Sequence, residues 1–406
     1  MYKIDESKHK EKYDLLLPSM LDGHYPLLKY MFWSRTYRPI LLDNDAGIVD
    51  EGLRYINNDM CFPVILITGQ MIKALKDGDF NIEKTHLLMA TAGDACRGAN
   101  YVPIMRRAVH KAGFNCRVLT INVAGFEKEN MLPVSFQMFW RGLFGMFYAD
   151  ILLALLWQTR PYELEKGAAD AMYKKWEERL ADDLRRNKHL SIKQMKNNFK
   201  LIVRDFKSLK LSGEKKQRVG IVGEIFGKYS HLGNYDVARY LEERGCEVYI
   251  NGLSWYVLYY IQSHMNSSKG VEKTVFNKAY GFIEKIQNCM IEAIRSEGFY
   301  VLDNMTTLRN QSKPYVSDNL NIGDGWLIGT EIIGMIKNDC RKVLAVAPFG
   351  CLPNCCCGRG VYHYLQRTFP EGMIVPVEPD SSASTQNYFN RVNMLIDWKG
   401  QKEDMA

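Results

Sequence analysis

Short apolar runs alternate with helical patterns in the first third of the chain. The runs cover residues 13–18, 39–43, 86–91 and 117–123. Between them, residues 64–75 and 101–112 repeat apolar side chains with the spacing of one helix face. Strands that alternate with helices are typical of a parallel sheet covered by helices. The pattern therefore predicts a first α/β lobe over residues 1–131.

The same alternation returns in the last part of the chain. Apolar runs at 218–222, 247–251, 342–347 and 373–377 are separated by helical patterns, for example at 237–244, and 384–395 adds a further one. This predicts a second α/β lobe over residues 217–406. We therefore expect two Rossmann- or flavodoxin-like lobes, each built on a parallel sheet.

The segment between the lobes, residues 132–216, has a wholly helical pattern. Its most apolar stretch, 133–157, is interrupted by Arg141 and Asp150. The uninterrupted apolar pieces of this stretch are therefore shorter than the ~18–20 consecutive apolar residues of a membrane span. We expect a helical connecting region and no membrane segment.

Charge changes the picture of this region. The whole chain has 53 Lys and Arg against 46 Asp and Glu; residues 160–218 take 17 and 9 of these, which leaves 36 against 37 elsewhere. Two interpretations stand: a solvated helical face, or a docking surface for an acidic partner protein or a phosphate-bearing substrate. Aromatic residues are sparse there and no nucleic-acid-binding motif occurs, so nucleic acid is disfavoured.

Composition sets the broad class. With 406 residues, 47% of them hydrophobic, the chain is too long and too apolar for a disordered segment or a small disulfide scaffold. At about 150 residues per domain it holds two or three domains. The first twenty residues are mostly polar, without the apolar core of a signal peptide. We therefore expect a cytoplasmic protein with reduced thiols.

Three of the ten cysteines share a setting. Cys61 precedes a helix that begins near Pro63, whereas Cys96 and Cys351 each follow a predicted strand. Ligands bind beyond the carboxyl ends of parallel strands, where a helix N-terminus stabilises negative charge and lowers a thiol pKa. Because two of these cysteines come from the first lobe and one from the second, a site that joins them would lie in the cleft between the lobes.

A second group of cysteines is the run Cys355, Cys356 and Cys357. Successive residues of a helix turn by about 100°, so at most two of the three side chains could face one centre. A second metal centre, redox chemistry and a chance run facing solvent remain open. The other four cysteines have the settings of packing residues: Cys116, Cys246, Cys289 and Cys340.

Other chemistry is weakly signalled. The glycine-rich stretch VGIVGEIFGKYSHLGN follows a predicted strand, but it is neither GxGxxG nor a phosphate-binding Walker loop. No HExxH, GxSxG or kinase motif occurs, and the eight histidines show no ligand spacing. Zinc hydrolysis and serine-based acyl transfer are therefore disfavoured.

Six segments in order resemble the iron–sulfur proteins related to 2-hydroxyacyl-CoA dehydratases, in particular the dehydratase-like portion found alone or fused to an acyl-CoA dehydratase activator. The segments, spread over most of the chain, are NNDMCFP, AGDACRGANY, VGIVGEIFGKYSHLGN, SDNLNIGDGWL, PFGCLPN and EPDSSASTQNYFNRVNMLI. The resemblance implies α/β lobes with an added helical region and a [4Fe–4S] cluster in the interlobe cleft. By resemblance, its ligands map to Cys61, Cys96 and Cys351.

The resemblance also implies chemistry and partners. In the dehydratases a separate ATP-hydrolysing activator injects one low-potential electron, and the substrate thioester is reduced to a ketyl radical that expels its hydroxyl group. This chain has no ATPase signature. We therefore expect an activator protein as partner, an acyl-CoA or small-molecule substrate, and a homo- or heterodimer.

Two departures from the family pattern leave the branch open. Relatives tend to have a histidine after the CLPN motif where this chain has Cys355, and glycines where it has Asp94 and Ala95. The extra thiols, Cys355 to Cys357, could complete a double-cubane 8Fe–9S cluster, as in relatives that resemble reductases of small molecules. A subunit that only carries a cluster, and an α/β binding protein with unmetallated cysteines, are the further alternatives.

Five residues beside the cysteines are candidates for lining the cleft. Arg97, Asn100 and Tyr101 follow the second cysteine, where they could instead cap and pack a helix. Glu224 and Lys228 follow the Gly223 turn and could make polar contacts from the second lobe. The sequence assigns no catalytic residue among them.

Overall fold

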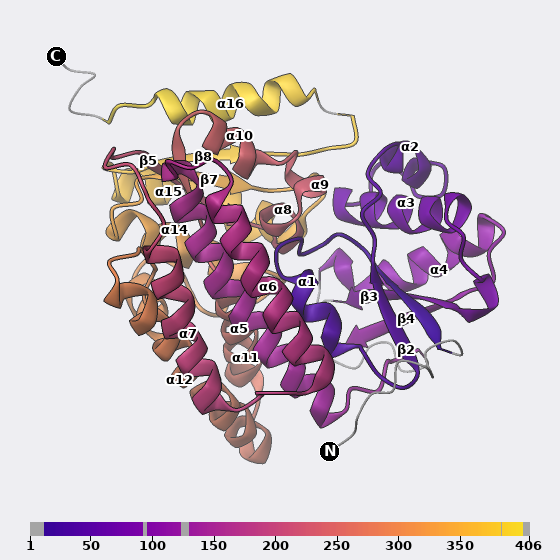
Figure 1. The fold of residues 1–406 in the computed structure, drawn as a ribbon. Helices are drawn as coiled ribbons and strands as arrows, with labels where there is room; N and C mark the ends of the chain where they lie inside the picture. The colour runs from indigo at the N-terminus through magenta and orange to yellow at the C-terminus, as the bar shows by residue number, and fades with distance from the viewer. Residues whose placement is uncertain (1–11, 92–95, 123–129, 383, 401–406) are drawn as a thin grey trace.

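Two four-stranded parallel sheets organise the molecule (Figure 1). The structure is a computed structural model, and it describes residues 12–91, 96–122, 130–382 and 384–400. The first sheet lies on the right of Figure 1, and the second lies with most of the helices on the left. The predicted α/β class with two parallel-sheet lobes is confirmed.

The first lobe has the strand order β2-β1-β3-β4. Its strands pair in parallel throughout, with Leu16 of β1 between Ile40 and Leu87. The four strands fall where the apolar runs predict them. The elements are β1 (Tyr13–Leu17), α1 (Tyr25–Leu28), β2 (Tyr37–Leu41), α2 (Ile48–Leu53), α3 (Phe62–Asp77), β3 (Thr85–Thr91), α4 (Tyr101–Lys111) and β4 (Arg117–Asn122).

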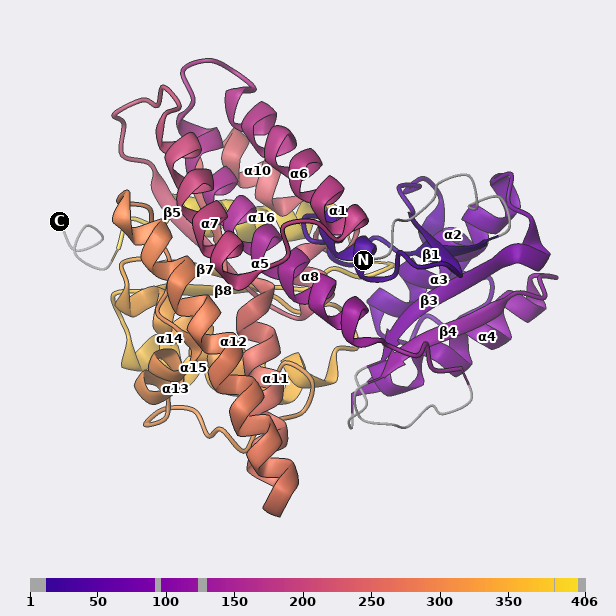
Figure 2. The ribbon, with the colours of Figure 1, turned by 60° about the horizontal axis from the view of Figure 1, so that its bottom comes forward.

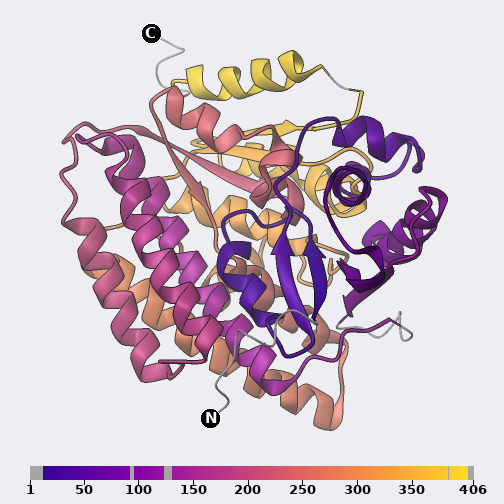
Figure 3. The ribbon, with the colours of Figure 1, turned by 45° about the vertical axis from the view of Figure 1, so that its right-hand side comes forward.

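The second lobe repeats this topology with the order β6-β5-β7-β8, again all parallel. Its four strands also match the predicted runs. In Figure 3 the C-terminal helix α16, in yellow, crosses the top of the molecule above strands of this sheet. The elements are β5 (Gln217–Gly223), α8 (Ile225–Tyr229), α9 (His231–Asn234), α10 (Val237–Glu243), β6 (Cys246–Ile250), α14 (Gly325–Lys337), β7 (Lys342–Val346), α15 (Arg359–Thr368), β8 (Met373–Val377) and α16 (Thr385–Asp397).

The connecting region is helical, as the sequence predicts, and three of the four helices described between β6 and β7 join it. One hydrophobic cluster runs from this region through the second sheet, so the helices and the second lobe share a core. Figure 2 shows these helices side by side, apart from the first lobe at the right. The helices are α5 (Phe136–Thr159), α6 (Ala168–Arg186), α7 (Ile192–Lys207), α11 (Leu253–Ser267), α12 (Gly270–Ser296) and α13 (Met305–Ser312).

Helix α5 is the centre of that shared core. It is the one described helix long and apolar enough to cross a membrane by length and composition, but 83% of its most apolar window is buried inside the protein. Its Asp150 accepts hydrogen bonds from the backbone N–H groups of Leu253 and Ser254 at the start of α11, and from His24. These bonds satisfy a buried carboxylate, and they identify α5 as a core helix of a globular fold.

Segment 224–234 joins the two lobes. Phe226 of α8 is 1% exposed and belongs to the hydrophobic cluster of the first lobe, although it follows the first strand of the second sheet. The Ser230 hydroxyl donates to the carbonyl of Ser19 at 2.7 Å, and His231 bonds the Asp22 carboxylate. The segment that leaves β5 is thereby held against the first lobe.

Candidate metal centre between the lobes

The three cysteines predicted as ligands lie in loops: Cys96 and Cys351 follow strands, and Cys61 follows helix α2. Cys61 is the N-cap of α3, with extended backbone angles and Pro63 in the first helical turn. Cys96 is the N-cap of a 3₁₀ turn, Arg97–Asn100, and Cys351 follows β7 by five residues. Proline in a first turn and an extended N-cap are the local signals that begin a helix at these places.

The Cys61 and Cys351 loops touch across the lobes. The backbone N–H of Phe62 donates to the carbonyl of Phe349 at 3.0 Å. Gly350 has a φ of +74°, and a side chain there would lie 2.9 Å from the Cα of Cys61 and 3.1 Å from a guanidinium nitrogen of Arg97. A residue with a Cβ fits neither this backbone conformation nor this contact. Gly350 therefore allows the two cysteine loops to meet.

Each of the three sulfurs has a hydrogen-bond donor. The Tyr101 hydroxyl lies 2.9 Å from the Cys61 sulfur, and the Asn354 amide nitrogen donates to the Cys351 sulfur at 3.2 Å. The backbone N–H of Gly98 points at the Cys96 sulfur at 3.4 Å. Donors to sulfur stabilise negative charge on it and tune a bound metal cluster.

Burial opposes that charge in the absence of a cation. Cys61 is 3% and Cys351 is 5% exposed. Burial raises the pKa of the Cys61 thiol, while the hydrogen bond to Tyr101 acts in the other direction. Burial also raises the pKa of Cys351, and the neighbouring Glu224 raises it further. Thiolates at these positions are therefore stable when cations neutralise them, as metal ions do.

Glu224 lies at the centre of this electrostatic neighbourhood. Its carboxylate accepts from the backbone N–H of Gly227 at 2.8 Å and so caps α8. Burial raises the pKa of Glu224 to about 7, against the lowering effect of its backbone hydrogen bonds and of Lys228. Its charge also acts on Cys61, Tyr101 and Cys351.

Lys228 lies elsewhere. Its side chain is 2% exposed, and its ammonium makes hydrogen bonds of 2.9 and 3.0 Å to both carboxylate oxygens of Glu331 in the second lobe. The structure therefore gives Lys228 a buried ion pair rather than a place on the cleft surface. It contributes a positive charge near Glu224 and no described contact with the cysteines.

The cysteine run forms a π-helical turn, Asn354–Gly358, before α15. Cys355 and Cys356 are exposed, whereas Cys357 is buried. Burial raises the pKa of Cys357, with smaller contributions from Cys356 and Asp324. Asp324 also acts on Cys351, so Cys357 shares this neighbour with a predicted ligand. The three thiols therefore differ in exposure, with two exposed and one buried.

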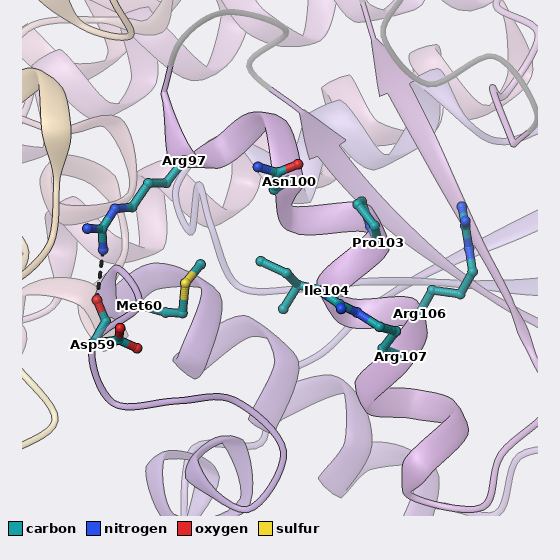
Figure 4. Close-up of a pocket in the computed structure, with 8 residues that line it drawn as sticks. All are labelled: Asp59, Met60, Arg97, Asn100, Pro103, Ile104, Arg106 and Arg107. Carbon is teal, nitrogen blue, oxygen red and sulfur yellow. Dashed lines mark hydrogen bonds between the residues drawn. The ribbon is translucent and has the colours of Figure 1, made fainter.

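A cavity of about 800 Å³ opens beside the first two cysteine loops (Figure 4). Arg97 lines the cavity, and its guanidinium group donates to the carbonyl of Asp59 at 2.7 Å. Asn100 lines this cavity of the first lobe, and Met60 and Ile104 form apolar parts of the wall; the remaining lining residues are Pro103, Arg106 and Arg107. The cavity combines a positively charged rim with apolar surface, which suits an anionic organic molecule.

Sequence reasoning did not find several of these contributors. Asn354 and Asp324 lie in two of the resembling segments, PFGCLPN and SDNLNIGDGWL, but nothing in those segments assigns them a role, and Arg106 and Arg107 lie in no motif. Two local signals were present: Asn354 is three residues after Cys351, and Gly350 immediately precedes it. The departures at residues 94 and 95 lie outside the residues that the structure describes.

The structure does not gather the three predicted ligands into a metal-binding group. Within residues 12–91, 96–122, 130–382 and 384–400, which include Cys61, Cys96 and Cys351, no three His, Cys, Asp or Glu side chains are placed to hold one metal ion. Ligation of a cluster by these cysteines stays a prediction.

The comparisons with known proteins leave the family open. The chain matches no protein-family model and no curated protein.

Proposed function

We propose that this chain is an iron–sulfur protein related to the 2-hydroxyacyl-CoA dehydratases, which receives low-potential electrons from an ATP-hydrolysing activator. The observation that carries the proposal is the contact between the Cys61 and Cys351 loops, with a donor on each sulfur. Cys61, Cys96 and Cys351 would hold a [4Fe–4S] cluster. All ten cysteines lie in described residues and none is disulfide-bonded, which supports a reducing compartment such as the cytoplasm.

The cluster would supply one-electron chemistry at low potential, with one iron free of a protein thiolate. The side chains around it would prepare the site for such chemistry. Tyr101 and Asn354 stabilise charge on the sulfurs of Cys61 and Cys351. Glu224, with a pKa of about 7, would hold a proton at its carboxyl group and donate it to a group expelled from a bound molecule.

Substrate binding is proposed for the cavity beside Arg97. Its arginine rim would hold the anionic part of an acyl-CoA or another small organic anion. Its apolar wall, formed in part by Met60 and Ile104, would exclude water from the reacting end. Arg97 is already positioned through the Asp59 carbonyl, so it needs little reorganisation on binding.

Iron analysis tests the proposal directly. The chain, purified without oxygen and reconstituted with iron and sulfide, should contain about four irons per chain for a single cubane. Cys61→Ala, Cys96→Ala and Cys351→Ala should each lose most of the iron and the cluster absorbance. Cys289 lies on α12 and is not a predicted ligand, so Cys289→Ala is the matched control and should keep both the iron and the cluster absorbance. Trace iron in the wild type, or normal iron in Cys61→Ala, contradicts the proposal.

A second candidate is a double-cubane reductase of small molecules. The observation that favours it is the buried Cys357, which shares Asp324 as a neighbour with Cys351. An 8Fe–9S cluster requires about eight irons per chain. Cys357→Ala should then halve the iron content, whereas a single cubane should leave it unchanged.

A further inference from the structure

A second cavity lies between α15 and α16, at the edge of the second sheet. It has a volume of about 540 Å³, within the range of small-molecule sites. We call it the α15–α16 groove, and its main lining residues are Arg359, Tyr362, Glu378, Ser384, Tyr388 and Arg391. None of the predicted cluster ligands lines this groove, so it is distinct from the cleft between the lobes.

The walls of the groove carry positive charge from two helices. Arg359 comes from α15 and Arg391 from α16, and both are exposed. Glu378 neutralises part of this charge through an ion pair of 2.6 Å with Arg359. Within the part of the chain that the structure describes, Arg391 makes one long hydrogen bond, 3.4 Å, to the carbonyl of Pro376. Most guanidinium donors of the pair thus remain open to an oxygen-rich anion.

The floor of the groove is aromatic and contains an unpaired hydroxyl. Tyr362 is 7% and Tyr388 is 4% exposed. Among the residues that the structure describes, the Tyr388 hydroxyl has no hydrogen-bond partner. The hydroxyl oxygen is itself buried, so the two largely buried tyrosines contribute an apolar floor to the groove.

The start of α16 adds donors at the same place. Ser384, the N-cap of this 13-residue helix, makes no side-chain cap hydrogen bond and lines the groove. The first N–H groups of a helix favour an anion. Phosphate, with three oxygens on one centre, can accept donors from two opposite arginines and a helix terminus, whereas a carboxylate has only two oxygens.

We propose that the α15–α16 groove binds a small organic phosphate of about mononucleotide size. Its phosphate lies between Arg359 and Arg391, and its ring lies on the tyrosine floor. Occupancy also reaches the cleft, because the Tyr362 hydroxyl contacts the Asn354 side-chain oxygen at 3.4 Å, and Asn354 donates to the Cys351 sulfur. This last step rests on the proposed function, whereas binding in the groove does not.

Calorimetric titration of the full chain with AMP tests the binding, with and without a reconstituted cluster. Adenosine and inorganic phosphate separate the contributions of ring and phosphate, and AMP should bind more tightly than either. Arg391→Gln and Arg359→Gln should each weaken AMP binding about tenfold, equivalent to about 1.4 kcal/mol. Arg367→Gln, an exposed arginine of α15 outside the groove, should leave it unchanged.

Several results would overturn the site. These are the absence of binding by AMP, adenosine binding as tightly as AMP, and unaltered AMP affinity in Arg391→Gln. Because Arg391 makes one weak hydrogen bond, its substitution tests the site even where Arg359→Gln disturbs folding through Glu378. AMP binding is also measured on the chain without iron. A failure of the groove proposal can therefore be told apart from a failure of the cluster proposal.

The coupling to the cleft has its own measurement. AMP should shift the cluster reduction potential in the wild type and leave it unchanged in Tyr362→Phe, which keeps the ring but removes the hydroxyl contact to Asn354. An unchanged potential in AMP-bound wild type, or an equal shift in Tyr362→Phe, overturns the coupling.

Discussion

The two lobes have the same topology but unequal cores. The sheet orders β2-β1-β3-β4 and β6-β5-β7-β8 are the same when each lobe is numbered alone. Cys96 follows the end of β3 at Thr91 by five residues, and Cys351 follows the end of β7 at Val346 by five residues. Equivalent loops of two related sheets therefore each supply one candidate ligand, because both lie at the carboxyl edge of a third strand.

The difference between the lobes lies in how they are stabilised. The second sheet is part of one large cluster with α5, α6, α7, α11 and α12, whereas the first sheet has two smaller clusters on its two faces. The smaller lobe also takes Phe226 from the larger one. The first lobe therefore depends on its contact with the second. Any relative movement of the lobes would separate the Cys61 loop from the Cys351 loop.

The largest expected effect concerns the core of the second lobe. Lys228→Met leaves the Glu331 carboxylate buried and unpaired, so we expect a loss of about 3–5 kcal/mol in the free energy of unfolding, measured with urea. The double variant Lys228→Met with Glu331→Leu should recover much of it. Lys174→Met, which breaks an exposed pair with Glu177, should change stability by less than about 1 kcal/mol. Similar losses in the two single variants would show that the buried pair does not anchor this lobe.

The next effect concerns the contact between the lobes. Phe226→Ala removes a fully buried ring from the first-lobe cluster and should cost about 3 kcal/mol. Because the substitution weakens the contact between the lobes more than it weakens either sheet, the two lobes should then unfold in separate transitions. Limited proteolysis during urea unfolding would detect the first lobe unfolding by itself. A single transition at unchanged urea concentration would contradict the dependence of the first lobe on the second.

A smaller effect compares the sulfur donors of the two lobes, and it rests on the proposed cluster. Tyr101→Phe removes the donor to Cys61, and Asn354→Leu removes the donor to Cys351. A lost donor destabilises the more negative reduced state, so each variant should lower the reduction potential. A hydrogen bond of about 1 kcal/mol corresponds to roughly 40 mV for one electron. Redox titration measures it, Tyr364→Phe on the exposed face of α15 is the control, and a higher potential would refute the role of the donors.

The smallest effect is a pH dependence at the edge of the interlobe contact. The hydrogen bond with Asp22 raises the pKa of His231, with further support from Asp236 and Asp45. This contribution to stability is complete below the unfolded pKa of about 6.5 and is lost as pH rises through the higher folded value. His231→Gln should therefore flatten the pH dependence of unfolding between pH 6 and 8, as measured with urea. The prediction is contradicted if the stability that His231 adds, taken as the difference between the wild type and His231→Gln, rises between pH 6 and 8.

Much of the fold could be predicted from local patterns. All eight strands match apolar runs of the sequence, because a strand covered on both faces requires consecutive apolar residues. The same pattern places Cys61, Cys96 and Cys351 in loops at strand or helix ends, where they are found. Cys246 and Cys340, predicted as packing residues, are fully buried in the large core.

Other features could not be predicted in this way. The pattern separates a helical region from the second lobe, but it cannot show that α5 joins the second sheet in one core, since apolar helix faces do not specify their partners. It places Lys228 near the cleft, and only the packing of α8 against α14 directs the ammonium to Glu331. The π turn that contains Cys355, Cys356 and Cys357 has no distinct sequence signal.

The sequence by itself determined the two parallel sheets and the loops that hold the cysteines, since hydrophobic periodicity and helix-starting residues act over short distances. Only the tertiary structure decided which loops meet. The backbone of Gly350 meets Cys61, and the Tyr101 hydroxyl meets the Cys61 sulfur, although these residues lie far apart in the chain. The physical reason is that such contacts depend on how whole lobes pack, and packing is a property of surfaces that no single segment contains.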